Sequence, residues 1–432
     1  MDRVLAAAVP AHVGERVRLA GWLHHQRQLS RRTFLLLRDR SGIAQVVLEG
    51  DAIGQAAILA PESVLEIEGR VVASSQAPAG AEIVEPEISV LVSSEPQPPV
   101  ELHRPVLKES LPYLLDHAAI SLRHPARRAI SEVAAASVTG FRGTLDGLGF
   151  REIATPKLVG SASESGATVF RLDYFGRPAF LAQSPQLYKQ LMVGVLERVY
   201  EVGPVFRAEP SDTVRHLAEY VSLDIEMGFI DSYQDIMATT RDILAGMVLA
   251  VQEQAAAACR LLALELPEVP AEIPVVDFVA AQQMIEDATG EPIVGEPDLA
   301  PAHERWLGNW AQKEHGSTFL FVAGFPMRKR PFYTHPDPAR PAFSNSFDLL
   351  FRGAEIITGG QRLNRYDDYL AALAAIGQDP SMFAGFLEAY RHGMPPHGGF
   401  GMGLERWLWL LTGASNVREV TLFPRDLDRL TP

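Results

Sequence analysis

The chain has 432 residues, of which 47% are apolar, and it carries a formal net charge of −14. This size suits two globular domains with sizeable cores, and the acidic balance argues against general nucleic-acid binding. No apolar run is long enough for a membrane span, no secretory signal pattern is visible, and the single cysteine, Cys259, excludes an internal disulfide, so we expect a cytoplasmic protein.

Residues 1–100 contain five short segments with the alternating hydrophobicity of β-strands, at 17–22, 33–38, 44–48, 64–73 and 88–92. Five strands at this spacing predict a small barrel of the OB type, a fold that binds single-stranded nucleic acid. Residues 16–40 also hold a cluster of arginines against one acid, Asp39: Arg16, Arg18, Arg27, Arg31, Arg32, Arg38 and Arg40. From residue types alone, this cluster is either a solvated face or an RNA-binding face.

A Pro-rich break at 94–99 predicts a linker, and 101–125 a hinge. From Arg127 to Gly147 the pattern becomes helical, and the rest of the chain mixes strands and helices without regular βαβ alternation, which predicts an α+β domain over 126–432. Within it, 235–266 is Ala-rich and helical, while 267–316 shows no catalytic pattern. We therefore expect a helical insertion over about 235–316.

A strand, a polar loop and a second strand are predicted over 202–229. Phe206-Arg207-Ala208-Glu209 and Arg215-His216 lie in the loop, and Val221, Leu223, Ile225 and Met227 alternate with Ser222, Asp224 and Glu226 in the second strand. A carboxylate-bearing face beside arginines suits a triphosphate with metal ions, because arginine binds phosphate with two hydrogen bonds and keeps its charge. The four-residue pattern Phe206–Glu209, taken alone, is weak evidence for such a site, because short patterns of this kind often occur by chance.

A glycine run, Gly399-Phe400-Gly401-Met402-Gly403, precedes Leu404-Glu405-Arg406 and a helical pattern. Glycines allow the backbone to approach a planar ligand closely. The run could also be a dinucleotide-binding loop or a close-packed helix start, but the chain after it is too short for the βαβ unit that dinucleotide binding requires.

A third segment, Ser346–Leu349 and Arg352–Arg362, lies between these two. Together the three segments resemble the class II aminoacyl-tRNA synthetases, and specifically aspartyl-tRNA synthetases of the archaeal/eukaryotic type. Phe206–Glu209 with Arg215-His216 is similar to the second signature motif of this class, Gly401–Arg406 to the third, and Gly149–Pro156 after the helical run from Arg127 to the first. Gln183–Gln190 is the stretch that points to aspartate. The resemblance covers essentially the whole chain, and it favours RNA binding by the N-terminal barrel. It also implies a catalytic domain built on an antiparallel sheet flanked by helices.

The resemblance implies roles for ATP-binding residues. Arg207 would bridge the α-phosphate and the aspartate carboxylate, Glu209 would accept from the adenine amino group, Arg215 and His216 would hold the terminal phosphates, and Tyr220 and Arg406 would cover the two faces of adenine. Leu217, Gly403, Leu404 and Glu405 complete this ATP set, within which Arg207, Arg215 and Arg406 would be catalytic. Glu355 and Thr358 would hold Mg²⁺, with Thr358 standing where the family usually has serine.

It also implies an aspartate pocket. Lys189 and Arg362 would bind the side-chain carboxylate, Asp348 would orient Lys189, and Gln186 would complete the pocket with Thr358 and Arg207. Glu164 and Gln183 would meet the substrate ammonium group. Ser163–Gly166 resembles a mobile lid, although Ser165 stands where the family more often has glycine.

Finally, the resemblance implies tRNA partners and a homodimer. Arg27 and Phe34 would contact the anticodon, and His24 and Pro78 lean toward enzymes that charge asparagine tRNA as well as aspartate tRNA. One alternative is an asparaginyl-tRNA synthetase, which Lys189 opposes. Another is an inactive paralogue that only binds tRNA, which the presence of Arg207, Glu355 and Arg406 opposes.

Overall fold

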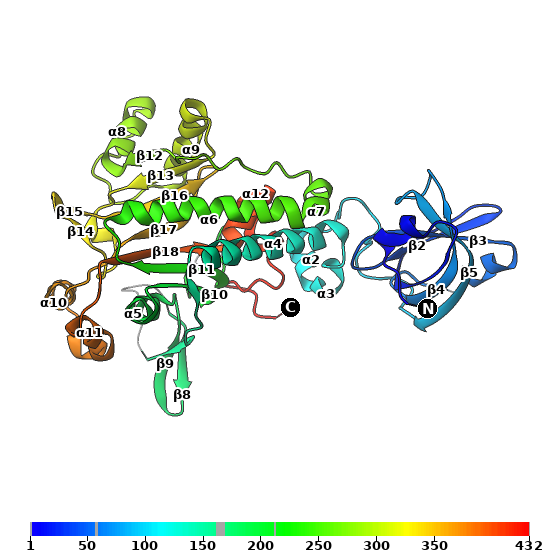
Figure 1. Ribbon diagram of the computed structural model, residues 1–432, viewed down its shortest axis with the longest axis horizontal. Coiled ribbons are helices and arrows are strands. Elements are labelled where there is room, and N and C mark those ends of the chain that lie inside the picture. Colours follow the sequence, from blue (N-terminus) through cyan, green and yellow to red (C-terminus); the bar gives the residue numbers. More distant parts are fainter. Residues whose placement is uncertain (1, 57–58, 161–168, 211–212, 432) are drawn as a thin grey trace. The chain divides into compact units, whose positions relative to one another are not determined.

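A computed structural model describes residues 2–56, 59–160, 169–210 and 213–431, and the chain divides into two compact units, Met1–Pro125 and Ala126–Pro432 (Figure 1). The expected hinge, 101–125, belongs to the first unit and contains the short helices α2 (Leu111–Asp116) and α3 (Ala118–Ser121). Among the helices of the described residues, none combines the length and apolar character that crossing a bilayer requires.

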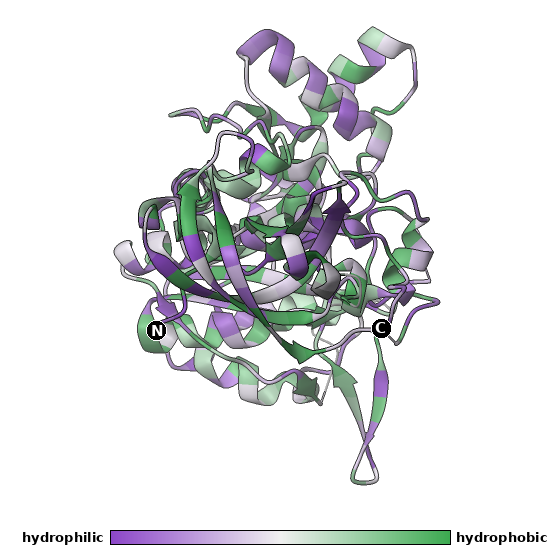
Figure 2. Cartoon of the chain, turned by 90° about the vertical axis from the view of Figure 1, so that its right-hand side faces the viewer, coloured by the Kyte–Doolittle hydropathy of each residue, from purple (hydrophilic) through white to green (hydrophobic). Residues whose placement is uncertain are grey.

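The first unit is a closed barrel with the strand order β1-β2-β3-β5-β4. Its strands are β1 (Arg16–Gln28), β2 (Arg32–Arg38), β3 (Ile43–Glu49), β4 (Val64–Ala73) and β5 (Ala81–Val92), accompanied by η1 (Ala6–His12), η2 (Gly50–Ala52) and α1 (Ile53–Ala56). Inward-facing aliphatic side chains such as Leu19, Leu35 and Ile67 form its core, and Figure 2 shows hydrophobic and hydrophilic residues alternating along these strands. The predicted OB-type barrel is confirmed.

One irregularity interrupts β1. Its register against β2 shifts between Leu23 and His25, which makes a β-bulge at His24. Because the bulge adds a residue, the side chains of Leu23 and His24 are both buried despite being consecutive. Beyond it, Arg27 pairs directly with Phe34.

The second unit is built on an eight-stranded sheet with the order β12-β13-β16-β17-β18-β11-β10-β6. Its strands are β6 (Arg151–Glu152), β10 (Arg198–Phe206), β11 (Glu219–Gly228), β12 (Val275–Asp277), β13 (Phe319–Ala323), β16 (Ser346–Phe351), β17 (Ala354–Gln361) and β18 (His397–Gly403). The α+β class is confirmed, but the sheet expected to be antiparallel is mixed. Strand β6 runs parallel to β10 and β12 parallel to β13, whereas the other pairs are antiparallel.

Two long helices cover one face of this sheet, α4 (Pro125–Gly147) and α6 (Tyr233–Gln254). They approach so closely that a Cβ on Gly140 would lie 2.5 Å from the carbonyl oxygen of Gly246. Ser232 begins α6 with a capping box, and the predicted long helix breaks near Ala255 into α6 and α7 (Ala256–Leu261).

The segment expected as a helical insertion is not helical throughout. Strand β12 joins one edge of the sheet, and α8 (Phe278–Thr289) and α9 (Pro301–His315) pack beside it on a separate apolar core. The remaining elements are β7 (Leu158–Val159), β8 (Arg171–Tyr174), β9 (Arg177–Leu181), α5 (Gln186–Leu196), η3 (Met327–Lys329), β14 (Pro336–Asp337), β15 (Arg340–Ser344), α10 (Tyr366–Ala375), η4 (Pro380–Phe383), α11 (Ala384–Arg391), α12 (Leu404–Thr412) and η5 (Val417–Val420).

Candidate active site

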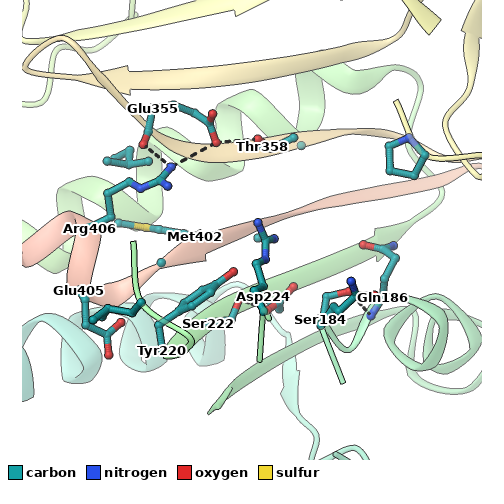
Figure 3. A pocket seen from close by; sticks show the side chains of 18 of the residues that line it. Ser184, Gln186, Tyr220, Ser222, Asp224, Glu355, Thr358, Met402, Glu405 and Arg406 are labelled. Carbon is teal, nitrogen blue, oxygen red and sulfur yellow. Dashed lines mark hydrogen bonds and ion pairs between the residues drawn. The ribbon is translucent and has the colours of Figure 1, made fainter. Parts of the chain in front are cut away.

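A single pocket collects most of the residues proposed from the sequence (Figure 3). Lining residues from that set are Gln183, Gln186, Arg207, Glu209, Arg215, His216, Leu217, Tyr220, Glu355, Thr358, Arg362, Gly403, Glu405 and Arg406. They come from β11, β17 and β18, from the loop between β10 and β11, and from the first turns of α5 and α12; Gln183 lies just before α5, and Arg362 directly follows β17. Glu355, Thr358 and Arg406 lie toward one end of the pocket, and Ser184 and Gln186 toward the other.

The strand–loop–strand prediction holds: β10 and β11 pair antiparallel, and the loop between them carries Arg207, Glu209 and Arg215. The alternation along β11 also holds, because Leu223 and Ile225 enter the core under the helices while Ser222 and Asp224 face the pocket. The period-2 pattern therefore predicts correctly which side chains of β11 face the apolar core and which face the pocket.

The glycine run is a central strand and not a loop. As β18 it lies between β11 and β17, which excludes the dinucleotide-loop alternative. A Cβ on Gly399 would lie 2.0 Å from the carbonyl oxygen of Ile225, and a Cβ on Gly401 would lie 3.3 Å from Oδ1 of Asp224. Side chains at these positions would push β18 away from β11 or fill the floor of the pocket.

Cationic side chains dominate one end of the pocket. The guanidinium of Arg207 lies over the Tyr220 ring, 5.6 Å from its centroid. His216 shares a 2.6 Å hydrogen bond between Nδ1 and Thr213 Oγ1. Burial lowers the pKa of His216, and the nearby arginines lower it further against the opposing charge of Glu209. The lowered pKa favours the neutral form of His216, so the positive charge at this end comes from the arginines.

Glu355, Thr358 and Arg406 form a second cluster at this end. The Thr358 hydroxyl donates to Glu355 Oε1 at 3.0 Å, and Arg406 Nη1 donates to the Glu355 carbonyl oxygen at 3.0 Å and lies 3.5 Å from Oε1. Carboxylate and hydroxyl oxygens this close fit a hard divalent cation that takes its other ligands from phosphates and water. In the part of the chain that the structure describes, no group of three or more His, Cys, Asp or Glu side chains could hold a metal ion.

Two members of the expected ATP set have other environments. Leu404 is buried in the apolar core and does not line the pocket. Glu405 lines the pocket, but both of its carboxylate oxygens accept the Val221 N–H at 3.1 Å, and burial raises its pKa to about 7. Glu405 therefore ties α12 to β11, and the structure provides no ligand role for the Leu404 side chain.

The opposite end of the pocket holds buried amides and a guanidinium. The side-chain Nε2 and Oε1 of Gln183 and Nε2 of Gln186 are buried without hydrogen-bond partners. Arg362 is 6% exposed and donates to Glu226 Oε1 at 2.9 Å, the Gly399 carbonyl at 3.0 Å and Gln186 Oε1 at 3.4 Å. Buried polar atoms without partners cost about 1–3 kcal/mol each, so this end is prepared for a polar ligand.

Lys189 lies directly behind this end and does not line the pocket. Its Nζ donates to Asp224 Oδ1 and the Phe400 carbonyl, both at 2.9 Å, and lies 3.4 Å from Glu226 Oε2. Burial opposes the charge of Glu226, but attraction to Arg362 and Lys189 outweighs it and lowers the pKa of Glu226. The carboxylates of β11, expected beside a triphosphate, instead pair with Lys189 and Arg362 at this end of the pocket.

The expected contact between Asp348 and Lys189 is wrong. Asp348 on β16 accepts from Arg330 Nη2 at 2.9 Å and pairs across the sheet with Thr358. Burial raises the pKa of Asp348 to about 7 against the opposing charge of Arg330. The Lys189 partners come from β11 because Lys189 on α5 faces β11 and β18, whereas β16 lies beyond β17.

Two further polar residues were not found from the sequence: one lines the pocket, and the other contacts residues that line it. Arg330 lines the pocket beside Pro331. Glu304 on α9 is 7% exposed, its Oε2 accepts from the Glu355 N–H at 3.1 Å, and burial raises its pKa. Glu304 comes from the stretch in which no catalytic pattern was visible, because a lone glutamate on an amphipathic helix carries no local signal.

Glu164 and the expected lid, Ser163–Gly166, lie outside the described residues.

The four barrel residues expected to contact or select tRNA have contrasting environments. Arg27 lies over the Phe34 ring at 5.1 Å on the outside of the barrel, where Arg27 is exposed and Phe34 half-buried. Pro78 is exposed in the turn between β4 and β5. His24, expected to bear on the choice of tRNA, is 6% exposed, and its Nδ1 lies 3.0 Å from Arg38 Nη1. Burial and the charge of Arg38 lower the pKa of His24 to about 4.

Comparison with known families agrees with both units. Residues 110–427 match the family model of class II tRNA synthetases (D, K and N), and residues 17–91 match that of the OB-fold nucleic acid binding domain. The chain belongs to the class II tRNA synthetases. Enzymes of this class are aminoacyl-tRNA ligases that use ATP with a divalent metal ion, in agreement with the arginines and the Glu355–Thr358 oxygens of the pocket.

Relatives of this synthetase cover its full length. It is 46% identical over 430 residues to the aspartate–tRNA(Asp/Asn) ligase of Thermus thermophilus, covering 100% of both chains, and 42% identical over 437 residues to that of Deinococcus radiodurans, covering 100% of this chain and 99% of the other. Among solved structures, the asparaginyl-tRNA synthetase of Pyrococcus horikoshii complexed with asparaginyl-adenylate superposes with a TM-score of 0.93 at 32% identity, covering 100% of both chains. The aspartyl-tRNA synthetase of Entamoeba histolytica superposes with a TM-score of 0.89 at 28% identity, covering 100% of this chain and 93% of the other. Fold similarity therefore does not separate aspartate from asparagine enzymes.

Proposed function

We propose that this synthetase is an aspartate–tRNA ligase that charges tRNA(Asp) and tRNA(Asn). The aspartate α-carboxylate attacks the α-phosphorus of ATP, the bond to the leaving pyrophosphate breaks, and aspartyl-AMP forms. The terminal ribose hydroxyl of tRNA then attacks the aspartyl carbonyl, and AMP leaves. The full-length relatives named aspartate–tRNA(Asp/Asn) ligase support this assignment.

The observation that carries the choice of aspartate is the pair of buried cations at the amino-acid end. Arg362 reaches the pocket, and Lys189 lies behind it in the same network of Asp224 and Glu226. A substrate carboxylate that contacts Arg362 there would be bound by a charge-assisted hydrogen bond, which an asparagine amide cannot match. Gln183 and Gln186 offer buried amides for the remaining polar atoms of the substrate.

The opposite end suits the nucleotide. Arg207 would stabilise charge that develops at the α-phosphate, while Arg215 and Arg406 would bind phosphates and adenine; all three line the pocket. Such preorganised cations act by electrostatic stabilisation, so the activation step needs no nucleophile from the protein. We assign the divalent ion as Mg²⁺, held by Glu355 and Thr358, where it would neutralise phosphate charge.

The test of this function is pyrophosphate exchange into ATP. Exchange should require aspartate, proceed without tRNA, and be at least about a hundredfold less efficient with asparagine, roughly 2.7 kcal/mol of discrimination. Exchange that asparagine drives better than aspartate would favour an asparaginyl-tRNA synthetase, and absence of exchange with both amino acids would favour the inactive paralogue.

Charging of both tRNAs is proposed from the barrel. A bulky side chain that excludes one anticodon base would have to stand on the barrel surface, whereas His24 is turned inward by the bulge and Pro78 lacks a backbone N–H donor. Purified tRNA(Asp) and tRNA(Asn) should therefore be aspartylated with efficiencies within about a hundredfold of each other, less than about 2.7 kcal/mol of discrimination. A larger preference for tRNA(Asp) would contradict this part of the proposal.

We also propose a homodimer. Strand β6 is an edge of the large sheet, and both of its residues, Arg151 and Glu152, are exposed. Exposed apolar side chains also occur in the C-terminal segment at Leu422, Phe423, Leu427 and Leu430. A free sheet edge and exposed apolar residues are suited to a two-fold interface. Light scattering at micromolar concentration should give a dimer, and a fully active monomer would refute it.

A further inference from the structure

Through Glu304 on α9, the segment between α7 and β13 contacts two residues that line the pocket, Arg215 and Glu355. The Oε2 atom of this side chain accepts the Glu355 N–H at 3.1 Å and lies 3.6 Å from Arg215 Nη1. Glu304 is 7% exposed, so both contacts are made away from bulk water, where charge interactions are stronger. One carboxylate thus contacts the loop that carries Arg215 and the strand that carries Glu355.

The helix that carries Glu304 is held tightly against the turn between β16 and β17. A Cβ on Gly308 would lie 2.5 Å from Cα of Gly353, and a Cβ on Gly353 would lie 3.0 Å from Cα of Arg305. Arg352 precedes Gly353 in the turn and donates to the Leu410 carbonyl oxygen at 2.8 Å. This packing leaves α9 little freedom to shift relative to the turn, so the position of Glu304 is well defined.

We infer that Glu304 is a positioning residue for ATP, which holds Arg215 in place for the terminal phosphates and fixes the backbone at Glu355. The inference rests on the proposed ATP-dependent function. A direct phosphate contact is unfavourable because a carboxylate repels phosphate, so Glu304 acts through its two partners. Residues 267–316 thereby contribute to nucleotide binding, although they contain no signature motif of the family.

Two substitutions separate charge from shape. Glu304→Gln keeps an oxygen acceptor for the Glu355 N–H but removes the charge that faces Arg215, and Glu304→Ala removes both. The matched control is Glu314→Gln on the same helix, where Glu314 is half-exposed and pairs with its neighbour Lys313. Thermal melting shows whether each variant is folded.

Aspartate-dependent pyrophosphate exchange provides the main readout. Glu304→Gln should raise the KM for ATP about tenfold, as expected for the loss of one charge-assisted contact, while its KM for aspartate stays unchanged. The control variant should show the wild-type KM for both substrates. In an Arg215→Ala background, Glu304→Gln should cause no further rise. An unchanged KM for ATP, a parallel rise in the KM for aspartate, or an equal rise in the Arg215→Ala background would overturn the inference.

Failure of the proposed function is distinguishable from failure of this inference. If the wild-type enzyme shows no aspartate-dependent exchange, the proposed function is wrong, and Glu304 is then tested by calorimetric ATP binding alone. Weaker ATP binding by Glu304→Gln, again by about tenfold, would support the positioning role, and equal affinity for the variant and the wild type would refute it.

Discussion

Lys189→Met is a sharp test of the amino-acid end. The substitution keeps an unbranched side chain one atom shorter but removes the cation that bonds Asp224 and the Phe400 carbonyl at 2.9 Å. Removing one partner of a buried charge pair costs about 3–5 kcal/mol. The free energy of unfolding of the catalytic unit, measured in urea, should therefore fall by about 3–5 kcal/mol. Aspartate should also be used less efficiently by about a hundredfold or more, because Asp224 and Glu226 would then exceed Arg362 in charge.

A double variant separates the structural and substrate-binding parts of this effect. Lys189→Met with Asp224→Asn restores local charge balance, so most of the lost stability should return, while aspartate-dependent exchange should stay low. The control is Lys313→Met, whose side chain is 82% exposed and should change neither quantity. A KM for aspartate within about threefold of wild type in Lys189→Met, less than 1 kcal/mol, would refute the reasoning, as would recovery of exchange in the double variant.

Three further predictions concern chemistry, metal and pH. Arg207→Ala should lower the rate of aspartyl-AMP formation by about a hundredfold or more at saturating ATP, and a normal rate with only a raised KM would contradict its role. Glu355→Gln should raise the Mg²⁺ concentration for half-maximal exchange about tenfold, whereas an unchanged requirement would place the ion elsewhere. The pKa of His24 is depressed from 6.5 to about 4, so its contribution to stability is present above pH 6.5 and is lost as pH falls toward 4. The barrel should lose about 2 kcal/mol of stability between pH 7 and pH 5 from this group, and a His24→Gln variant with the same pH profile in urea unfolding would contradict this.

The sequence alone determined the elements that rest on local patterns. Alternating hydrophobicity located the five barrel strands and assigned Leu223 and Ile225 to the core face of β11, because side chains on a strand alternate between its two faces. The clustered arginines and glycines of the loop and of β18 predicted a phosphate-binding site, and most of them line one pocket. These features depend on neighbours within a few residues, which a single sequence displays directly.

The tertiary structure decided which charges meet and which side chains turn inward. Lys189 bonds the Phe400 carbonyl 211 residues away, and Asp348 pairs with Arg330 and not with Lys189, because strand order sets the neighbours of each buried charge. His24 is buried by a one-residue bulge, which reverses the face that strict alternation assigns. Glu304 is brought against Glu355 and Arg215 by the packing of α9 on the β16–β17 turn. Contacts of this kind depend on how distant elements pack, and no pattern within one segment records them.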